Sequence, residues 1–129
     1  MGEQYQEWVK QADYDMDTAD AMFDSGRYIY AVFMCHLSIE KALKGLYAQK
    51  LDEVPPKTHN LLYLLNKIGQ KPEQALEKFL VKLNTASITT RYPDDLAKLQ
   101  AVYTSEITQE MIVQSKELLR WVKMKLQKH

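Results

Sequence analysis

Residues that can carry acid–base chemistry lie one turn apart on a single predicted helix. His36 and Glu40 are four positions apart, so their side chains project from the same helix face. A histidine beside a carboxylate can transfer a proton near neutral pH, and the same pair also occurs as a buried structural ion pair. We favour the structural pair. Lys44, one further turn along, joins both residues as a ligand-binding candidate.

A second set of polar residues lies at predicted helix ends and loops. His59 begins a short helix, and the segment RYPDD places Arg91, Tyr92 and Asp94 in one compact loop. The Tyr92 ring offers a stacking surface, and the Arg91 guanidinium can bind a phosphate or carboxylate through two hydrogen bonds. We favour a structural role for this loop. In that role an Asp caps the next segment, Arg91 forms an ion pair with the Asp, and Pro93 fixes the turn. All four residues remain ligand-binding candidates.

Several enzyme classes lack the residues that their chemistry needs. A di-iron bundle requires Glu three positions before His, but Phe33 precedes His36 at that distance. One Cys and three His give no zinc-binding spacing, and the four Gly are too scattered for a phosphate-binding loop. Cys35 and His36 point about 100° apart, so they cannot form a nucleophile–base pair by themselves. The sequence therefore predicts no metal site and no cofactor.

The helix that positions His36 and Glu40 is predicted to span residues 27–50. It carries two adjacent apolar stripes. The first comprises Tyr28, Val32, Cys35, Ile39, Ala42 and Leu46, and the second comprises Ile29, Phe33, His36, Glu40, Leu43 and Tyr47. A helix with one stripe packs on one surface, so two stripes indicate packing on two. We expect these surfaces to be the chain's own bundle and a second subunit, which predicts a homodimer formed through this helix.

Helical signals also precede and follow this segment. Residues 3–24 form a predicted helix that ends at Ser25-Gly26, so it should make an antiparallel hairpin with residues 27–50. After a loop that contains two prolines, residues 59–68 are predicted to form a short helix with Thr58 as its N-cap.

The rest of the chain is also predicted to be helical. Gly69 ends the short helix, and Pro72 is expected in the first turn of the next helix, which decays over residues 87–90. A loosely structured or short helical segment, residues 96–105, leads to the last helix, for which Thr108 is the expected cap. No segment alternates with period two over the length of a strand, so the sequence predicts an all-α fold.

The composition is that of an ordinary soluble domain. The chain has 129 residues, 46% of them hydrophobic and 26% charged, which is enough for one domain with its own core. No apolar run approaches the ~18 residues that a membrane span needs, and the N-terminal segment has no secretory signal. A single cysteine is consistent with a reducing, cytoplasmic location.

The balanced net charge conceals an asymmetry between the two ends of the chain. Residues 1–24 hold seven acidic residues and one Lys, whereas residues 111–129 hold five basic residues and one Glu. The favoured interpretation is that these two helices pack side by side and neutralise each other, within the fold or across a dimer. The alternative is a basic surface for RNA or for an acidic partner.

Four sequence features, taken in order, carry a family resemblance. They are the segment EWVKQADYDMDTADAMFDSGRYIYAVFMCHLSIEKALKGLYA, the segment THNLLYLLNKIG after a Pro-containing loop, the loop TTRYPDD and the segment QSKELLRWVKMKL. Together they cover nearly the whole chain. The chain resembles the HEPN (higher eukaryotes and prokaryotes nucleotide-binding) domain family, in particular the subgroup found beside minimal nucleotidyltransferases.

The resemblance implies one domain over residues 1–129, with an up-and-down bundle of four main helices and a short additional helix, commonly as a homodimer. Many family members are ribonucleases, often toxins held in check by a nucleotidyltransferase antitoxin, and others only bind. The ribonucleases use an Arg and a His separated by four to six residues. Here eight residues separate Arg27 from His36, and Arg91 has no His within that window. The resemblance therefore implies no catalytic residue.

The sequence favours a non-catalytic nucleotide- or RNA-binding component that pairs with a minimal nucleotidyltransferase in a toxin–antitoxin-like system. The alternative is a divergent metal-free ribonuclease toxin, in which His36 or His59 approaches Arg91 in the folded dimer. A third possibility is a structural dimer that only holds another protein. Tyr92 and Tyr103 are candidate acceptors of a nucleotidyl group from the partner.

Overall fold

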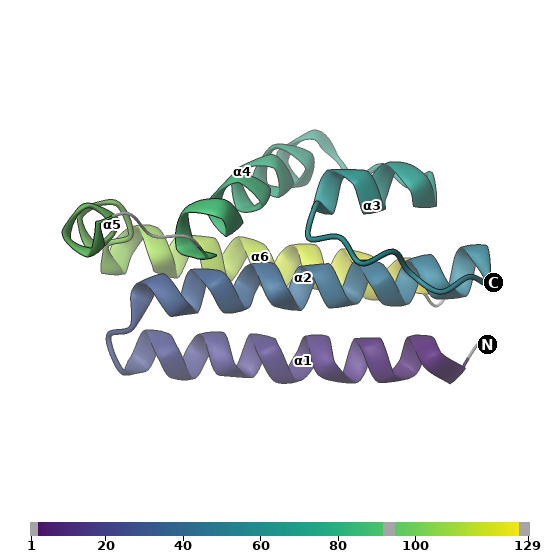
Figure 1. Cartoon of the computed structure of the whole chain (residues 1–129), viewed down its shortest axis with the longest axis horizontal. Coiled ribbons are helices and arrows are strands. Elements are labelled where there is room, and N and C mark those ends of the chain that lie inside the picture. The colour runs from purple at the N-terminus through teal and green to yellow at the C-terminus, as the bar shows by residue number, and fades with distance from the viewer. Residues whose placement is uncertain (1–2, 92–94, 127–129) are drawn as a thin grey trace.

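Every described segment with regular structure is helical. The computed structural model describes residues 3–91 and 95–126, and this part of the chain forms six helices and no strand. The helices are α1 (Glu3–Asp24), α2 (Tyr28–Leu51), α3 (Leu61–Ile68), α4 (Gln74–Arg91), α5 (Leu96–Val102) and α6 (Ser105–Leu126). Three long helices, α1, α2 and α6, run along the molecule, and the short helices α3 and α5 lie toward its opposite ends (Figure 1). The prediction of an all-α bundle is confirmed.

The central element of the bundle is α2. It packs extensively against α1, α3, α4 and α6 and makes only a small contact with α5. No residue from 31 to 49 is exposed. The two apolar stripes are therefore both covered within one chain: α1 and α6 cover one side, and α3 and α4 cover the side that carries His36 and Glu40. The second stripe is buried without a second subunit. It therefore gives no support to the homodimer, which stays a prediction.

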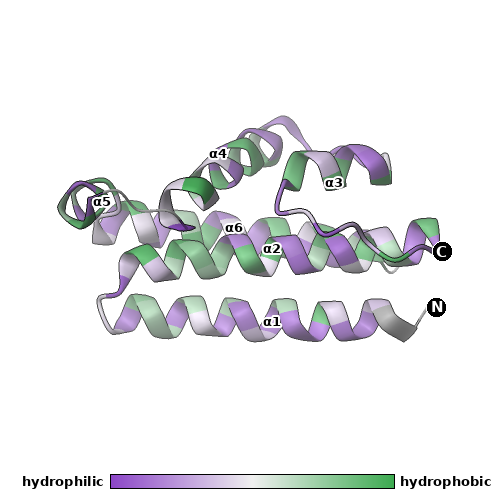
Figure 2. Cartoon of the chain, viewed as in Figure 1, coloured by the Kyte–Doolittle hydropathy of each residue, from purple (hydrophilic) through white to green (hydrophobic). Residues whose placement is uncertain are grey.

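The hairpin of α1 and α2 depends on close approach of the two helices. Hydrophobic and hydrophilic residues are interspersed along α1 (Figure 2). The apolar stripe of α1, which includes Ala12, Met16 and Ala19, is buried. A Cβ placed on Gly45 would lie 3.1 Å from the Trp8 Cβ and 3.2 Å from the Tyr5 main-chain oxygen. Glycine at this position therefore lets the α1 backbone pack directly on α2.

The predicted starts of two helices are wrong by a few residues. The N-cap of α3 is Asn60, whose side chain accepts a hydrogen bond from the Tyr63 amide, whereas the Thr58 hydroxyl accepts one from the Asn60 amide. At α6, the Thr104 hydroxyl accepts from the Ile107 amide, and Thr108 is buried within the helix. In both places two suitable capping residues are close together, so the residue type alone does not indicate which one is used.

The boundaries of α4 also differ from the prediction. Its first residue is Gln74, so Pro72 precedes the helix, and the helix continues through Ser87 and Thr90 to Arg91. The Ser87 hydroxyl donates to the Asn84 carbonyl and the Thr90 hydroxyl donates to the Ala86 carbonyl. These bonds satisfy buried hydroxyl groups inside the helix, so the run of Ser and Thr does not end it.

The segment after the RYPDD loop forms the helix α5. Asp95 is its N-cap, with the side chain accepting from the Lys98 amide at 3.3 Å, so the expectation of a capping Asp is confirmed at this residue. None of the seven residues of α5 is buried, and only Leu99 packs in part against the core. This helix is therefore the least supported element of the bundle.

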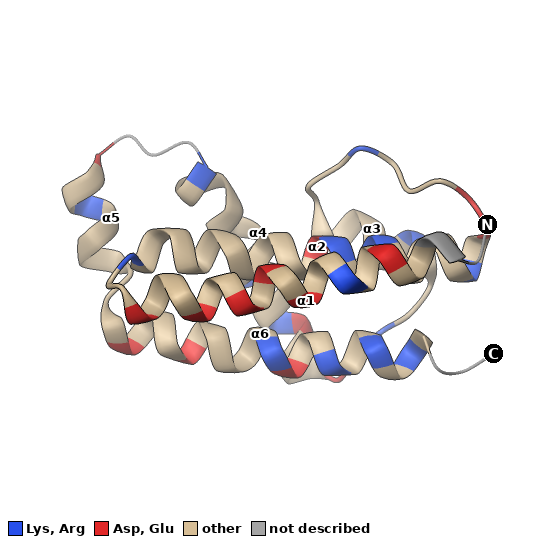
Figure 3. Ribbon diagram, turned by 90° about the horizontal axis from the view of Figure 1, so that it is seen from below, with Lys and Arg blue, Asp and Glu red and all other residues tan. Residues whose placement is uncertain are grey.

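Acidic α1 and basic α6 neutralise each other across their contact. The Lys116 ammonium is 2.9 Å from an Asp20 carboxylate oxygen, and Lys123 pairs with Asp13. Figure 3 shows the acidic residues along α1 and the basic residues gathered toward the C-terminal half of α6. The predicted side-by-side packing of these two helices is confirmed within one chain, and two ion pairs join them. No described helix is long and apolar enough to cross a membrane.

Candidate functional site

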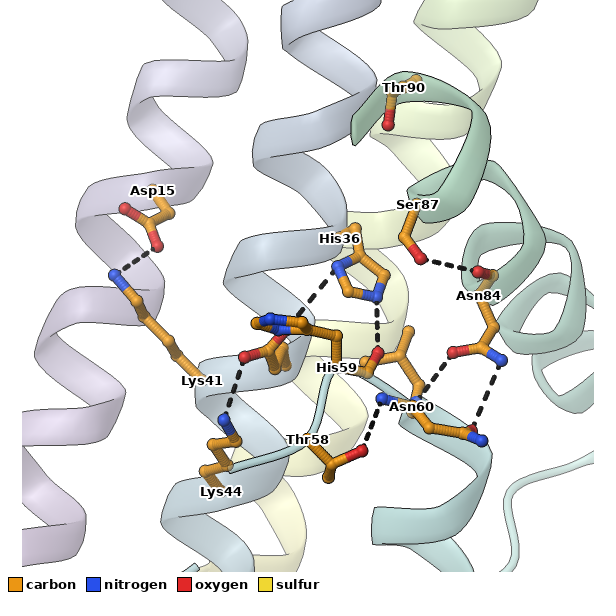
Figure 4. Close-up of polar contacts among 12 residues, drawn as sticks. Asp15, His36, Lys41, Lys44, Thr58, His59, Asn60, Asn84, Ser87 and Thr90 are labelled. Carbon is orange, nitrogen blue, oxygen red and sulfur yellow. Dashed lines mark hydrogen bonds and ion pairs between the residues drawn. The ribbon is translucent and has the colours of Figure 1, made fainter. Parts of the chain in front are cut away.

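The residues with acid–base potential meet at the buried carboxylate of Glu40. One oxygen, Oε2, accepts a hydrogen bond from the Lys44 ammonium at 3.0 Å, and the other, Oε1, accepts from Nδ1 of His59 at 2.9 Å. Glu40 and Lys44 are buried, whereas the His59 side chain is 57% exposed. Figure 4 shows Lys44 and His59 converging between α2 and the start of α3. The carboxylate is thus paired on both oxygens.

His36 lies behind this carboxylate and has no contact with solvent. Its Nε2 is 3.0 Å from the His59 main-chain oxygen, which can only accept, so Nε2 carries the proton. The other ring nitrogen, Nδ1, is 3.8 Å from Glu40 Oε1 and has no hydrogen-bond partner among the described residues. Burial lowers the pKa of His36 to about 4, although the neighbouring Glu40 charge acts in the opposite direction. His36 is therefore neutral at pH 7.

The sequence folds this way because polar side chains fix the loop before α3. The Asn84 side chain on α4 accepts a hydrogen bond from the Leu61 amide at 2.8 Å and donates to the Asn60 side chain at 3.4 Å. The main-chain oxygen and imidazole of His59 are bound by His36 and Glu40 of α2. The cluster therefore joins α2, α3 and α4 at one point.

Arg91 reaches the same region but does not join the hydrogen-bonded cluster. Its guanidinium lies over the Phe33 ring, 4.9 Å from the centroid, and one of its nitrogens is buried with no hydrogen-bond partner in the described part of the chain. After burial itself, the positive charge of Arg91 is a further influence that lowers the pKa of His36. Tyr92 and Asp94 lie outside the described residues.

Two candidates for covalent chemistry are inaccessible. Cys35 is fully buried, and burial raises the pKa of its thiol to about 11, so it is not a nucleophile at neutral pH. Tyr103 is also buried, and its hydroxyl hydrogen-bonds to Thr89 at 3.1 Å, which leaves it a poor acceptor for a nucleotidyl group. Within residues 3–91 and 95–126, no group of three His, Cys, Asp or Glu side chains is arranged to hold a metal ion.

A pocket of about 400 Å³ lies away from the cluster, where the turn between α1 and α2 faces α5. Its lining residues are Gly26, Arg27, Tyr28, Ile29, Tyr30, Leu96, Gln100, Tyr103 and Thr104. The sequence-based candidates did not include this set, because its two halves are about 70 positions apart. The one local indication of such a pocket is that Arg27, Tyr28 and Tyr30 lie close together in the sequence, around the start of α2.

The HEPN domain family model matches residues 5–125. The chain belongs to the HEPN domain family. The HEPN fold is also that of two solved structures, ST0689, an archaeal HEPN homologue, and TT1696 from Thermus thermophilus. Each superposes with a TM-score of 0.76 at 24% identity, over 95% of this chain and 98% of the other. No curated protein sequence matches the chain.

In this HEPN domain the histidine–glutamate cluster joins α2 to the loop before α3. Glu40 and His36 are both buried, with His36 0% exposed, so neither side chain is open to a substrate. General acid–base catalysis requires a group within hydrogen-bond reach of the substrate. In the cluster the His59 ring is exposed, and the bond from its Nδ1 to Glu40 leaves Nε2 as the ring nitrogen available to a ligand.

Proposed function

We propose that this HEPN protein is a non-catalytic component that binds a nucleotide or RNA and acts together with a nucleotidyltransferase. The observation that carries the proposal is the burial of two of the residues suited to acid–base catalysis. His36 and Glu40 are both buried within the chain and His36 is neutral at pH 7, which leaves the exposed His59 ring as the one histidine of the cluster open to a substrate. Binding needs no such group.

The nucleotidyltransferase partner is proposed from the family subgroup that the sequence features resemble, with a toxin–antitoxin-like pair as the setting. We also propose that the protein acts as a homodimer. Because residues 31–49 of α2 are covered within the chain, the subunit contact would use surfaces outside this stretch. Light scattering on the purified protein gives its mass in solution, and a monomer at micromolar concentration argues against the dimer.

Affinity purification of the protein from its native cell, followed by mass spectrometry, tests the proposed partnership. A nucleotidyltransferase recovered at near-equal stoichiometry supports it. In parallel, titration with nucleotides and short RNA oligonucleotides measures binding. If the protein recovers no such partner and binds neither ligand at micromolar concentration, the proposal is wrong.

A ribonuclease function is the second candidate, because one observation favours it. Arg91 lies close enough to His36 to affect its pKa, and the exposed His59 is part of the same cluster. An RNA cleavage assay on wild type, His59→Ala and Arg91→Ala separates the two functions. Cleavage that both substitutions abolish, with helical content retained, would establish a nuclease. Equal activity in all three proteins would show that neither His59 nor Arg91 takes part in cleavage, which contradicts this candidate.

A further inference from the structure

The pocket between the start of α2 and α5 differs from the Glu40 cluster in having an unused charge. Arg27 is the single charged residue among the nine that line it. The Arg27 side chain has no ion pair or hydrogen bond within the described part of the chain, and it is exposed. A guanidinium presents several donors in a fixed plane, an arrangement that matches a phosphate. The pocket therefore favours an anionic group.

The remaining lining residues are suited to a flat ring. Three tyrosines, Tyr28, Tyr30 and Tyr103, contribute to the walls. Tyr28 is held by the Phe23 ring at a centroid distance of 5.4 Å, and Tyr103 by its hydrogen bond to Thr89. Tyr30 is 60% exposed, so its ring is available for stacking. Nucleobases stack on aromatic side chains irrespective of base identity, because every base has a flat π face.

Polar groups also line the pocket beside these rings. The Gln100 amide both donates and accepts, as does the Thr104 hydroxyl, so together they can bond the edge of a heterocycle or a ribose. The volume of about 400 Å³ is within the usual range for small-ligand pockets, about 300–1,000 Å³.

We propose that this pocket binds a nucleoside monophosphate, with the base against Tyr30 and the phosphate on Arg27. The assignment rests on the binding function proposed above and names its ligand class. A single cation suits one phosphate group. An RNA strand would need several basic side chains along its backbone, because phosphate contacts dominate the affinity of nucleic-acid binding. A purely apolar ligand would leave the Arg27 charge unused.

Calorimetric titration with AMP, GMP, CMP and UMP, and with adenosine as the ligand without phosphate, tests the assignment. We expect at least one mononucleotide to bind the wild type, and adenosine to bind more weakly than AMP. In Arg27→Ala and in Tyr30→Ala the Kd should rise about tenfold or more, the effect of losing a charge-assisted hydrogen bond or a stacking partner.

Two control variants match the test variants in chemistry and exposure. Tyr14→Ala removes a tyrosine that is 73% exposed on α1, and Lys82→Ala removes an exposed cation from α4. Neither residue lines the pocket, so both controls should bind as the wild type does. Circular dichroism verifies that each variant keeps its helical content.

The outcomes distinguish failure of the pocket from failure of the proposed function. If mononucleotides bind equally to wild type, Arg27→Ala and Tyr30→Ala, the pocket assignment is wrong and the binding function stands. If the wild type binds RNA or a nucleotidyltransferase but no mononucleotide, the ligand class is wrong and the function again stands. If adenosine binds as tightly as AMP, Arg27 does not hold a phosphate and the assignment is overturned.

Discussion

The Glu40 cluster and the Arg27 pocket each contain a cationic side chain, but in opposite states. In the cluster, the Lys44 ammonium and the His59 ring are both bonded to the Glu40 carboxylate. In the pocket, Arg27 has no partner within the described residues and stands beside the exposed Tyr30. Residue type indicates which chemistry is possible, whereas the pairing of each group indicates whether it is still available to a ligand.

The largest expected effect comes from removing the centre of the cluster. Glu40→Ala leaves the buried Lys44 ammonium and the His59 ring without their acceptor, and loss of one partner of a buried pair costs about 3–5 kcal/mol. Urea denaturation of this variant, compared with Glu110→Ala at an exposed position of α6, measures the difference. Equal stability of the two variants would show that the cluster does not hold the fold.

The next effect is a pH dependence that arises from His36. The unfolded chain protonates this histidine near pH 6.5, whereas the folded protein does so only near pH 4. Between these values the unfolded state binds more protons, so the free energy of unfolding falls as the pH falls, by about 3 kcal/mol in all. In His36→Asn this part of the dependence should be lost. Denaturation of the wild type and of His36→Asn at pH 7 and pH 4.5 measures this difference. An equal loss of stability in the two proteins at pH 4.5 would contradict the prediction.

A smaller effect is expected where charges are paired but not buried. The Lys116 and Asp20 side chains are both about half exposed, so the pair should contribute about 0.2–1 kcal/mol. Denaturation of Lys116→Ala at low and at high salt measures this, with Lys82→Ala on α4 as a surface control. A loss as large as that in Glu40→Ala would mean that pairing alone, without burial, determines the energy.

The smallest effect is expected in the pocket. Arg27→Ala should change the free energy of unfolding by no more than about 0.5 kcal/mol, because the side chain is exposed and forms no ion pair within the described chain. A thermal melt of this variant beside the wild type is sufficient. A large loss of stability would place Arg27 among the residues that hold the fold and would remove the contrast with the cluster.

Local sequence signals account for most of the fold. The helix α1 has the predicted bounds, and α2 is displaced by only one residue, because glycine, proline and apolar periodicity act over a few positions. That His36 and Glu40 lie on the same face of α2 was predictable for the same reason, although the carboxylate bonds to Lys44 and His59 while His36 Nδ1 stays 3.8 Å away. The bond from His59 to Glu40 joins residues 19 positions apart, and the pocket joins residues still farther apart. Such contacts depend on how helices pack, which a single sequence does not specify.

The absence of buried side chains in α5 has a consequence for the timescale of exchange with solvent. Local opening costs less free energy where few apolar contacts are lost, so amide hydrogens of α5 should exchange with deuterium far faster than those of α2. One wall of the pocket can thus unfold and refold while the long helices stay intact. A molecule held there would slow deuterium uptake in α5 first, because it would add contacts to a helix that has few of its own.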